Sequence, residues 1–235
     1  MKLGTYVSIT LATQDPEQSM AFYEALDWQK ISEDTLSDGS INLRLRKGDF
    51  SSPTLSYMGS DISAIRALFS PDKQKRKGTP ATTAEFKDPN GLRITIDADE
   101  STNAMPAGTP TTRTPASRFG KFGEFSIPTK DLPKSMNFWT KLGFEALHMA
   151  KIPYPYAILS DGLIVLGLHQ FDQPAIALAY FAEDMIDRIK QLKAAGLQIV
   201  DFPSDGSEDP NTTETENAML SSPEGQAFYL NKEVL

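Results

Sequence analysis

TQDPEQSMAFYEAL, residues 13–26, decides the fold of this 235-residue chain, because the sequence contains the same pattern twice. It recurs 116 positions later as TKDLPKSMNFWTKL, residues 129–142. Each copy follows a strand-like run, and each half ends with a Pro–x–Gly turn, at residues 89–91 and 223–225. Self-similarity of this kind indicates a duplicated structural unit.

Each copy opens the same order of elements. In the second half, alternating apolar residues predict strands over 122–128, 154–159, 163–170 and 175–180, with a final hairpin of 218–221 and 226–231. Helical spacing predicts helices over 135–142 and 184–195, with Asp131 as the N-cap of the first. In the first half the same patterns predict strands over 7–12, 41–46, 54–58 and 92–97 and helices over 16–26 and 62–69. Each half is therefore expected to hold two strand–helix–strands units.

A segment rich in Thr, Pro and small residues separates the two copies. Residues 101–118 read STNAMPAGTPTTRTPASR and carry no hydrophobic period, which is typical of a linker. The sequence therefore predicts one domain over residues 1–100 and a second over residues 119–235.

Composition limits the class of protein. The chain has no cysteine, so it has neither disulfides nor thiolate ligands. It has no apolar run long enough to span a membrane, and its N-terminus lacks the apolar core of a signal peptide. A net charge of −8 argues against nucleic-acid or membrane-surface binding. We therefore expect a cytoplasmic protein whose partner is a small molecule.

Taken together, the motifs resemble the vicinal oxygen chelate superfamily, which includes glyoxalases, bleomycin-resistance proteins and extradiol dioxygenases. The resemblance rests on a strand, an Asp, the run Ser-Met-x-Phe-(Tyr/Trp)-x-x-Leu and a closing Pro-x-Gly turn, all present twice. Asp27 stands where the pattern usually has Gly. The resemblance implies an α+β fold of four βαβββ units, forming two glyoxalase-like domains whose curled mixed sheets enclose clefts.

In metal-using members the resemblance implies four ligand positions in each cleft, filled by His, Glu or Gln. In this chain those positions fall on Ser8 and Glu124, on Arg44 or Arg46 and Gly167 or His169, on Thr54 and Ala177, and on Thr95 and Tyr229. Most of them lack a metal-binding side chain. We therefore expect no complete metal site, with a divalent metal held by Glu124 and His169 as the alternative.

Strand alternation gives the two expected clefts different linings. In the second half one strand face is expected to carry Glu124, Ser126, Gly167, His169, Ala177, Ala179, Ala227 and Tyr229. The opposite face, with Leu178, Tyr180 and Phe228, is expected to lie under the helices. In the first half the equivalent face is expected to be polar and cationic, with neither carboxylate nor imidazole, which makes this half a degenerate partner.

These residue types suggest roles in the second-half cleft. Glu124 is the candidate general base, and His169 or Tyr229 would polarise a carbonyl or carry a proton. Each has a structural reading as well: Glu124 as a partly buried acid paired with a neighbouring donor, His169 as a solvated strand end, and Tyr229 as pocket wall. Ser126, Gly167 and Ala177 would line the ligand site.

Two further pairs are candidate ligand contacts. Tyr154 and Tyr156 could form an aromatic rim or simply pack, and Arg44 and Arg46 could bind an anion or form salt bridges. The sequence thus favours a glyoxalase-like or bleomycin-resistance-like protein that binds a small organic ligand in its second half, as a monomer or homodimer. The alternative is a metal-dependent lyase or dioxygenase that uses Glu124 and His169.

Overall fold

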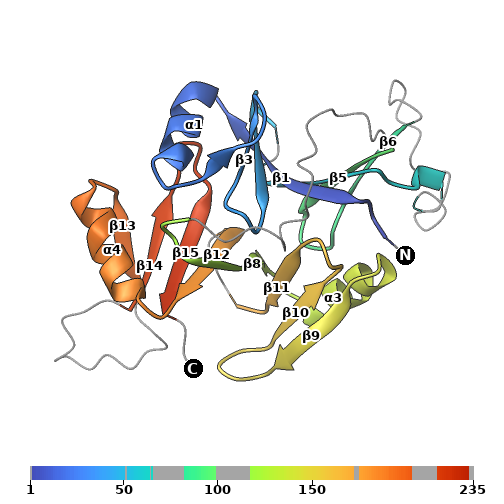
Figure 1. Cartoon of the computed structure of the whole chain (residues 1–235). Coiled ribbons are helices and arrows are strands. Elements are labelled where there is room, and N and C mark those ends of the chain that lie inside the picture. Colours follow the sequence, from blue (N-terminus) through green and yellow to red (C-terminus); the bar gives the residue numbers. More distant parts are fainter. Residues whose placement is uncertain are drawn as a thin grey trace.

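The computed structural model describes residues 2–50, 52–63, 65, 82–98, 117–171, 175–202 and 216–232. Here the strands form two mixed sheets with three helices beside them (Figure 1). Of the predicted linker only Ser117 and Arg118 are described, and the division into two domains stays a prediction. The predicted helix over 62–69 also lies largely outside the described residues.

The first sheet has seven strands in the order β2-β3-β4-β1-β5-β7-β6. In chain order its half comprises β1 (Tyr6–Thr13), α1 (Pro16–Glu24), β2 (Gln29–Lys30), β3 (Thr35–Ser37), β4 (Asn42–Lys47), β5 (Thr54–Met58), β6 (Thr83–Lys87) and β7 (Arg93–Asp97).

The second sheet has eight strands in the order β13-β14-β15-β12-β8-β11-β10-β9. Its half comprises β8 (Lys121–Pro128), α3 (Leu132–Lys141), β9 (Glu145–Ala150), β10 (Tyr156–Ser160), β11 (Val165–His169), β12 (Ala177–Ala182), α4 (Met185–Ala194), β13 (Ile199–Phe202), β14 (Asn217–Ser221) and β15 (Ala227–Lys232).

Both sheets repeat one arrangement of strands. β1 pairs parallel with β4 and antiparallel with β5, which pairs parallel with β7. In the same way β8 pairs parallel with β11 and antiparallel with β12, which pairs parallel with β15. Each half thus joins two units through their first strands, and the predicted α+β fold of four such units is confirmed.

Five of the described strands, β2, β3, β6, β9 and β13, lie outside the ranges predicted above. β2 and β3 have two and three residues, too few to show an alternating pattern. Alternation was present in β6, where Ala84 is buried between the less buried Thr83 and Glu85. β13 forms the outer edge of its sheet.

The repeated Thr-x-Asp…Ser motif forms hydrogen bonds at the start of α1 and α3. Asp15 accepts a hydrogen bond from the backbone N–H of Gln18 at 3.0 Å, which caps α1, and Asp131 caps α3 in the same way through Lys134. The hydroxyls of Thr13 and Ser19 lie 2.8 Å apart, and those of Thr129 and Ser135 lie 2.7 Å apart. The motif therefore ties each helix to the end of the preceding strand.

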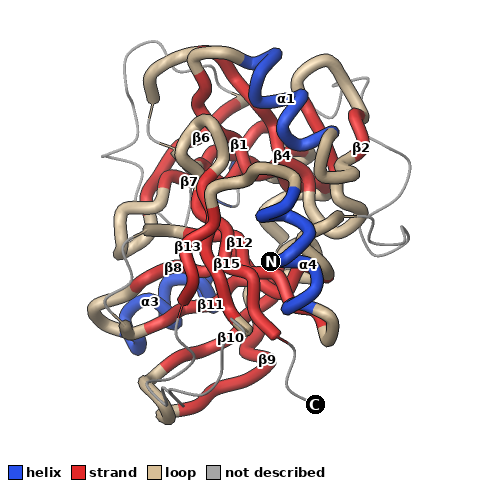
Figure 2. The backbone as a smooth tube through the Cα atoms, turned by 90° about the vertical axis from the view of Figure 1, so that its left-hand side faces the viewer, coloured by secondary structure: helices blue, strands red, loops and turns tan. Residues whose placement is uncertain are grey.

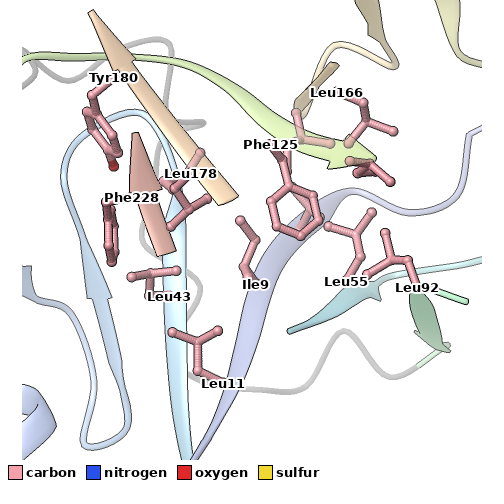
Figure 3. Close-up of a cluster of buried hydrophobic side chains, with 14 of the residues drawn as sticks. Ile9, Leu11, Leu43, Leu55, Leu92, Phe125, Leu166, Leu178, Tyr180 and Phe228 are labelled. Atoms are coloured by element: carbon pink, nitrogen blue, oxygen red, sulfur yellow. The ribbon is translucent and has the colours of Figure 1, made fainter. Parts of the chain in front are cut away.

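The apolar faces of the two sheets share one hydrophobic core. Ile9, Leu43 and Leu55 of the first half lie in the same cluster as Phe125, Leu178 and Phe228 of the second (Figure 3). Aromatic rings also cross between the halves, with centroids 6.2 Å apart for Tyr23 and Phe228. The face expected to lie under the helices is thus also buried against the other half, and burial of this kind dominates folding stability.

The helices pack on the apolar faces of the sheets, and their buried side chains belong to the same core. α3 packs on β10 and β11 while α4 packs on β13, β14 and β15, so the two helices cover separate parts of the second sheet (Figures 1 and 2). No helix in the described ranges is long and apolar enough to cross a membrane. The sheet faces turned away from the shared core carry the candidate site residues.

Candidate functional site

Strand register places the candidate residues of the second half on one face of its sheet. Glu124 pairs with Ala179, and Ala179 pairs with Tyr229. In the next row, Ser126 lies between Gly167 and Ala177. Small side chains therefore surround Glu124, as the sequence alternation predicts.

Glu124 and His169 form a hydrogen-bonded pair. The Nε2 atom of His169 lies 2.5 Å from Oε1 of Glu124, and only 12% and 9% of the two side chains are exposed. With the carboxylate as acceptor, Nε2 carries the proton. His169 is therefore not the solvated strand end that the sequence analysis weighed, and Glu124 has the neighbouring donor that its structural reading required.

Gly167 makes room for this pair. A Cβ atom at position 167 would lie 2.2 Å from both Cδ and Oε1 of Glu124, far inside van der Waals contact. The carboxylate thus lies directly over the glycine backbone on the neighbouring strand. The absence of a side chain at Gly167 is what admits the carboxylate, and its predicted contact with a ligand stays a prediction.

Aromatic rings surround the imidazole. The Tyr156 ring stacks on that of His169 with a centroid distance of 5.7 Å and an interplanar angle of 15°, while Tyr154 meets it edge-on at 5.8 Å. Tyr154 also stacks on Phe171 at 5.0 Å. The two tyrosines pack against the imidazole and against other rings. Their role as an aromatic rim for a ligand stays a prediction.

Burial keeps the neighbouring phenols protonated. It raises the pKa of Tyr154, and the charge of Glu124 adds to the effect. Burial likewise raises the pKa of Tyr229 above 10.0. Both are therefore hydrogen-bond donors at neutral pH.

The first half contains a hollow. A cavity of about 770 Å³ lies over the polar face of its sheet, within the size range of small-molecule sites. Arg44 and Arg46 line it, but so do Glu85 and Asp97. The expectation of a face without carboxylates is therefore wrong, because β6 and the end of β7 contribute two.

Two arginines of this cavity are already paired. Arg44 donates from Nε to Asp34 at 2.7 Å, and Arg93 donates from Nη2 to Glu85 at 2.7 Å. Arg44 therefore makes a salt bridge, within its own half. Although burial opposes it, hydrogen bonding from Arg44 lowers the pKa of Asp34, which keeps that carboxylate ionised.

The comparisons with known proteins rest on structure alone. No family model and no curated protein matches this chain. Homoprotocatechuate 2,3-dioxygenase from Arthrobacter globiformis superposes with a TM-score of 0.64 at 14% identity, covering 99% of this chain and 80% of that one. The fold is that of the extradiol dioxygenases.

Two further extradiol dioxygenase structures support this assignment. A variant of homoprotocatechuate 2,3-dioxygenase from Brevibacterium fuscum gives a TM-score of 0.62 at 15% identity, over 100% of this chain and 72% of that one. The 2,3-dioxygenase LapB from Pseudomonas sp. KL28 gives 0.59 at 10% identity, over 100% and 94%. These neighbours belong to the vicinal oxygen chelate superfamily. At such identities the likeness shows the extradiol dioxygenase fold only.

The donor set of this chain does not fit the metal centre that the resemblance implies. Glu124 and His169 are hydrogen-bonded to each other. At the third implied ligand position Ala177 has no donor atom in its side chain. At the fourth, Tyr229 is a protonated phenol. Across the described ranges there is no group of three His, Asp or Glu side chains that could hold a metal. A catalytic metal usually has three protein ligands, so two do not suffice.

Proposed function

We propose that this protein binds a small organic molecule against the Glu124–His169 face of the second sheet, without using a metal held by that face. The observation that carries the proposal is the near-buried carboxylate–imidazole pair, set over Gly167 and among alanines. Small wall residues around a few convergent polar groups are typical of ligand sites. This kind of binding is what the resemblance to the bleomycin-resistance branch implies.

The chemistry of the face favours a ligand with both a planar apolar part and a hydrogen-bond donor. Tyr154 and Tyr156 offer ring surface for stacking. The exposed tenth of Glu124 is an acceptor that a ligand hydroxyl or N–H group can reach. Tyr154 and Tyr229, held protonated, supply donors in return.

A second candidate function, metal-independent proton transfer, is favoured by the same pair. His169 is hydrogen-bonded through Nε2, and its Nδ1 atom is buried with no hydrogen-bond partner among the described residues. A carboxylate that orients an imidazole in this way is a common arrangement for general acid–base catalysis. In this function Glu124 and His169 would share the proton removed from a bound substrate.

The proposal is tested with the full chain and a panel of phenols, aromatic amines and aliphatic metabolites. Melting shifts and native mass spectrometry identify ligands, and calorimetry then compares the parent with Glu124→Gln. The matched control is Glu145→Gln, which changes an exposed glutamate of the same half. We expect at least tenfold weaker binding for Glu124→Gln only. Unchanged binding of every ligand would show that the pair is structural.

A further inference from the structure

The two halves of the chain carry the same framework with different side chains at equivalent places. Register aligns Thr10 with Arg44 in the first sheet, and Ser126 with Gly167 at the same place in the second. Two residues further along β4 and β11 lie Arg46 and His169. Two residues earlier along β1 and β8 lie Ser8 and Glu124.

The equivalent places differ in which charged groups have a partner. In the second half Glu124 lies over Gly167 and accepts from His169. In the first half Arg44 occupies the glycine position and Ser8 replaces the carboxylate. Arg46, at the place of His169, therefore lacks the acid that its counterpart has. It is exposed, and it has no hydrogen-bond or ion-pair partner among the described residues.

The cavity concentrates cations in an acidic protein. The chain as a whole has a net charge of −8. Even so, the described lining includes more cationic side chains than carboxylates, and these cations are Arg44, Arg46, Lys47, Lys87 and Arg93. A cleft lined by one sign of charge raises the local concentration of the opposite ion.

The rest of the lining favours an organic ligand over a bare ion. Arg44 and Arg93 flank Thr10 and Thr54 in one row across four strands, a span of roughly 14 Å at the usual strand spacing. The floor beside this row is a ladder of hydroxyls, with Ser56 2.8 Å from Thr10 and 3.0 Å from Thr95. Phe50 and Met58 add apolar wall. A cavity of about 770 Å³ also exceeds the needs of an inorganic anion.

We propose that the first-half cavity is a second ligand site, which binds a small organic carboxylate with an apolar body through the guanidinium of Arg46. A planar guanidinium donates two parallel hydrogen bonds to a carboxylate, which gives both affinity and orientation. The hydroxyl ladder and the apolar wall hold the remainder of the molecule. This site is separate from the Glu124–His169 face and does not depend on it.

Calorimetric titration of the full chain with benzoate and phenylacetate tests the site. Benzyl alcohol is the neutral control, and inorganic phosphate is the control for a bare anion. We expect one carboxylate bound per chain with a Kd below about 1 mM, weakening as salt is added. Both controls are expected to bind at least tenfold more weakly. Absence of saturable carboxylate binding, or equal binding of phosphate, would overturn the proposal.

Variants locate the site. Arg46→Gln is expected to weaken benzoate binding at least tenfold, and Arg46→Lys to weaken it less, since the charge remains but the fork is lost. Arg118→Gln removes an exposed arginine outside the cavity and is expected to leave binding unchanged. Glu124→Gln is also expected to leave it unchanged, which separates this site from the one in the second half. Equal affinity of Arg46→Gln and the parent would exclude this role of Arg46.

Discussion

The hydroxyl of Tyr180 donates a hydrogen bond to Oδ2 of Asp38, 2.6 Å away and 142 positions earlier in the chain. An equivalent hydrogen bond runs in the other direction, from the hydroxyl of Tyr57 in the first half to Oδ2 of Asp161 in the second, at 2.7 Å. Tyr57 and Tyr180 hold equivalent places on β5 and β12, and both acids belong to Asp–Gly turns. The duplicated unit therefore supplies a reciprocal pair of bonds that joins the halves.

The two bonds differ in burial, and this difference predicts unequal costs of removal. Asp38 is 1% exposed, whereas Asp161 is only partly buried. Tyr180→Phe leaves a buried carboxylate oxygen without its donor, and it is expected to lower the free energy of unfolding by about 1–3 kcal/mol. Tyr57→Phe is expected to cost less, because water can reach Asp161. Urea unfolding of both variants measures this, and equal costs would contradict it.

Asp38 also predicts a pH dependence. Burial raises its pKa above the ordinary 3.8, although hydrogen bonds from Tyr180 and the backbone oppose the shift. A carboxyl with a raised pKa in the folded state favours folding when protonated. Its contribution is complete below pH 3.8 and is lost as the pH rises through the folded pKa.

Asp38→Asn cannot ionise and is therefore expected to lack this loss. The free energy of unfolding of the variant, relative to the parent, is expected to rise between pH 3.8 and neutral pH. The pKa of Asp34 is lowered, so its effect on the pH dependence of stability is opposite to that of Asp38. Because Asp34 is present in both proteins, its effect cancels in the difference between them. Urea unfolding at several pH values provides the measurement. A pH-independent difference between the two proteins would rule out Asp38 as the source.

Gly167→Ala tests the geometry of the carboxylate–imidazole pair. The new methyl group would occupy the position of the Glu124 carboxylate, so the bond to His169 is expected to break. The expected cost is about 1.5–3 kcal/mol, the usual range for a hydrogen bond to a charged group. The imidazole nitrogen shifts of His169, followed by NMR, report loss of the bond directly.

A double-mutant cycle provides the control for Gly167→Ala. With Glu124→Ala already present, no carboxylate remains to be displaced, and adding Gly167→Ala is expected to cost little more. Additive costs would mean that the methyl group acts on something other than Glu124.

Divalent metals are expected to change the melting temperature of the parent by no more than about 1 °C. A ligand raises the melting temperature only when its concentration exceeds its dissociation constant for the folded state. The physical reason is the donor set: Glu124 and His169 satisfy each other, and burial keeps Tyr229 protonated. Melting curves with zinc, manganese or iron(II), and with a chelator, provide the test. A rise of several degrees that Glu124→Gln abolishes would instead establish a metal site on this face.

Local patterns were sufficient for the elements that carry the candidate residues. Alternation along β8, β11, β12 and β15 assigned Glu124, Ser126, Ala177 and Tyr229 to one face, because successive strand side chains point to opposite sides. Asp131 and the apolar spacing after it gave the start of α3. Where the pattern was short, as in β2 and β3, it failed.

The same reasoning misjudged the first half. Alternation placed Arg44 and Arg46 correctly on a polar face, yet the carboxylates of that face were missed. Glu85 lies on the unrecognised strand β6, and Asp97 stands at the end of β7. Asp34 reaches Arg44 from the turn before β3, a position that strand alternation does not describe.

The sequence by itself determined the duplication, the helix caps and the side of each sheet that faces the core, because these depend on residues a few positions apart. Only the tertiary structure decided that Glu124 meets His169, that Tyr180 meets Asp38 and that Arg46 lines a cavity. Those relationships join strands and turns that are distant along the chain. Their distances are set by sheet register and by packing of the two halves, which no local period encodes.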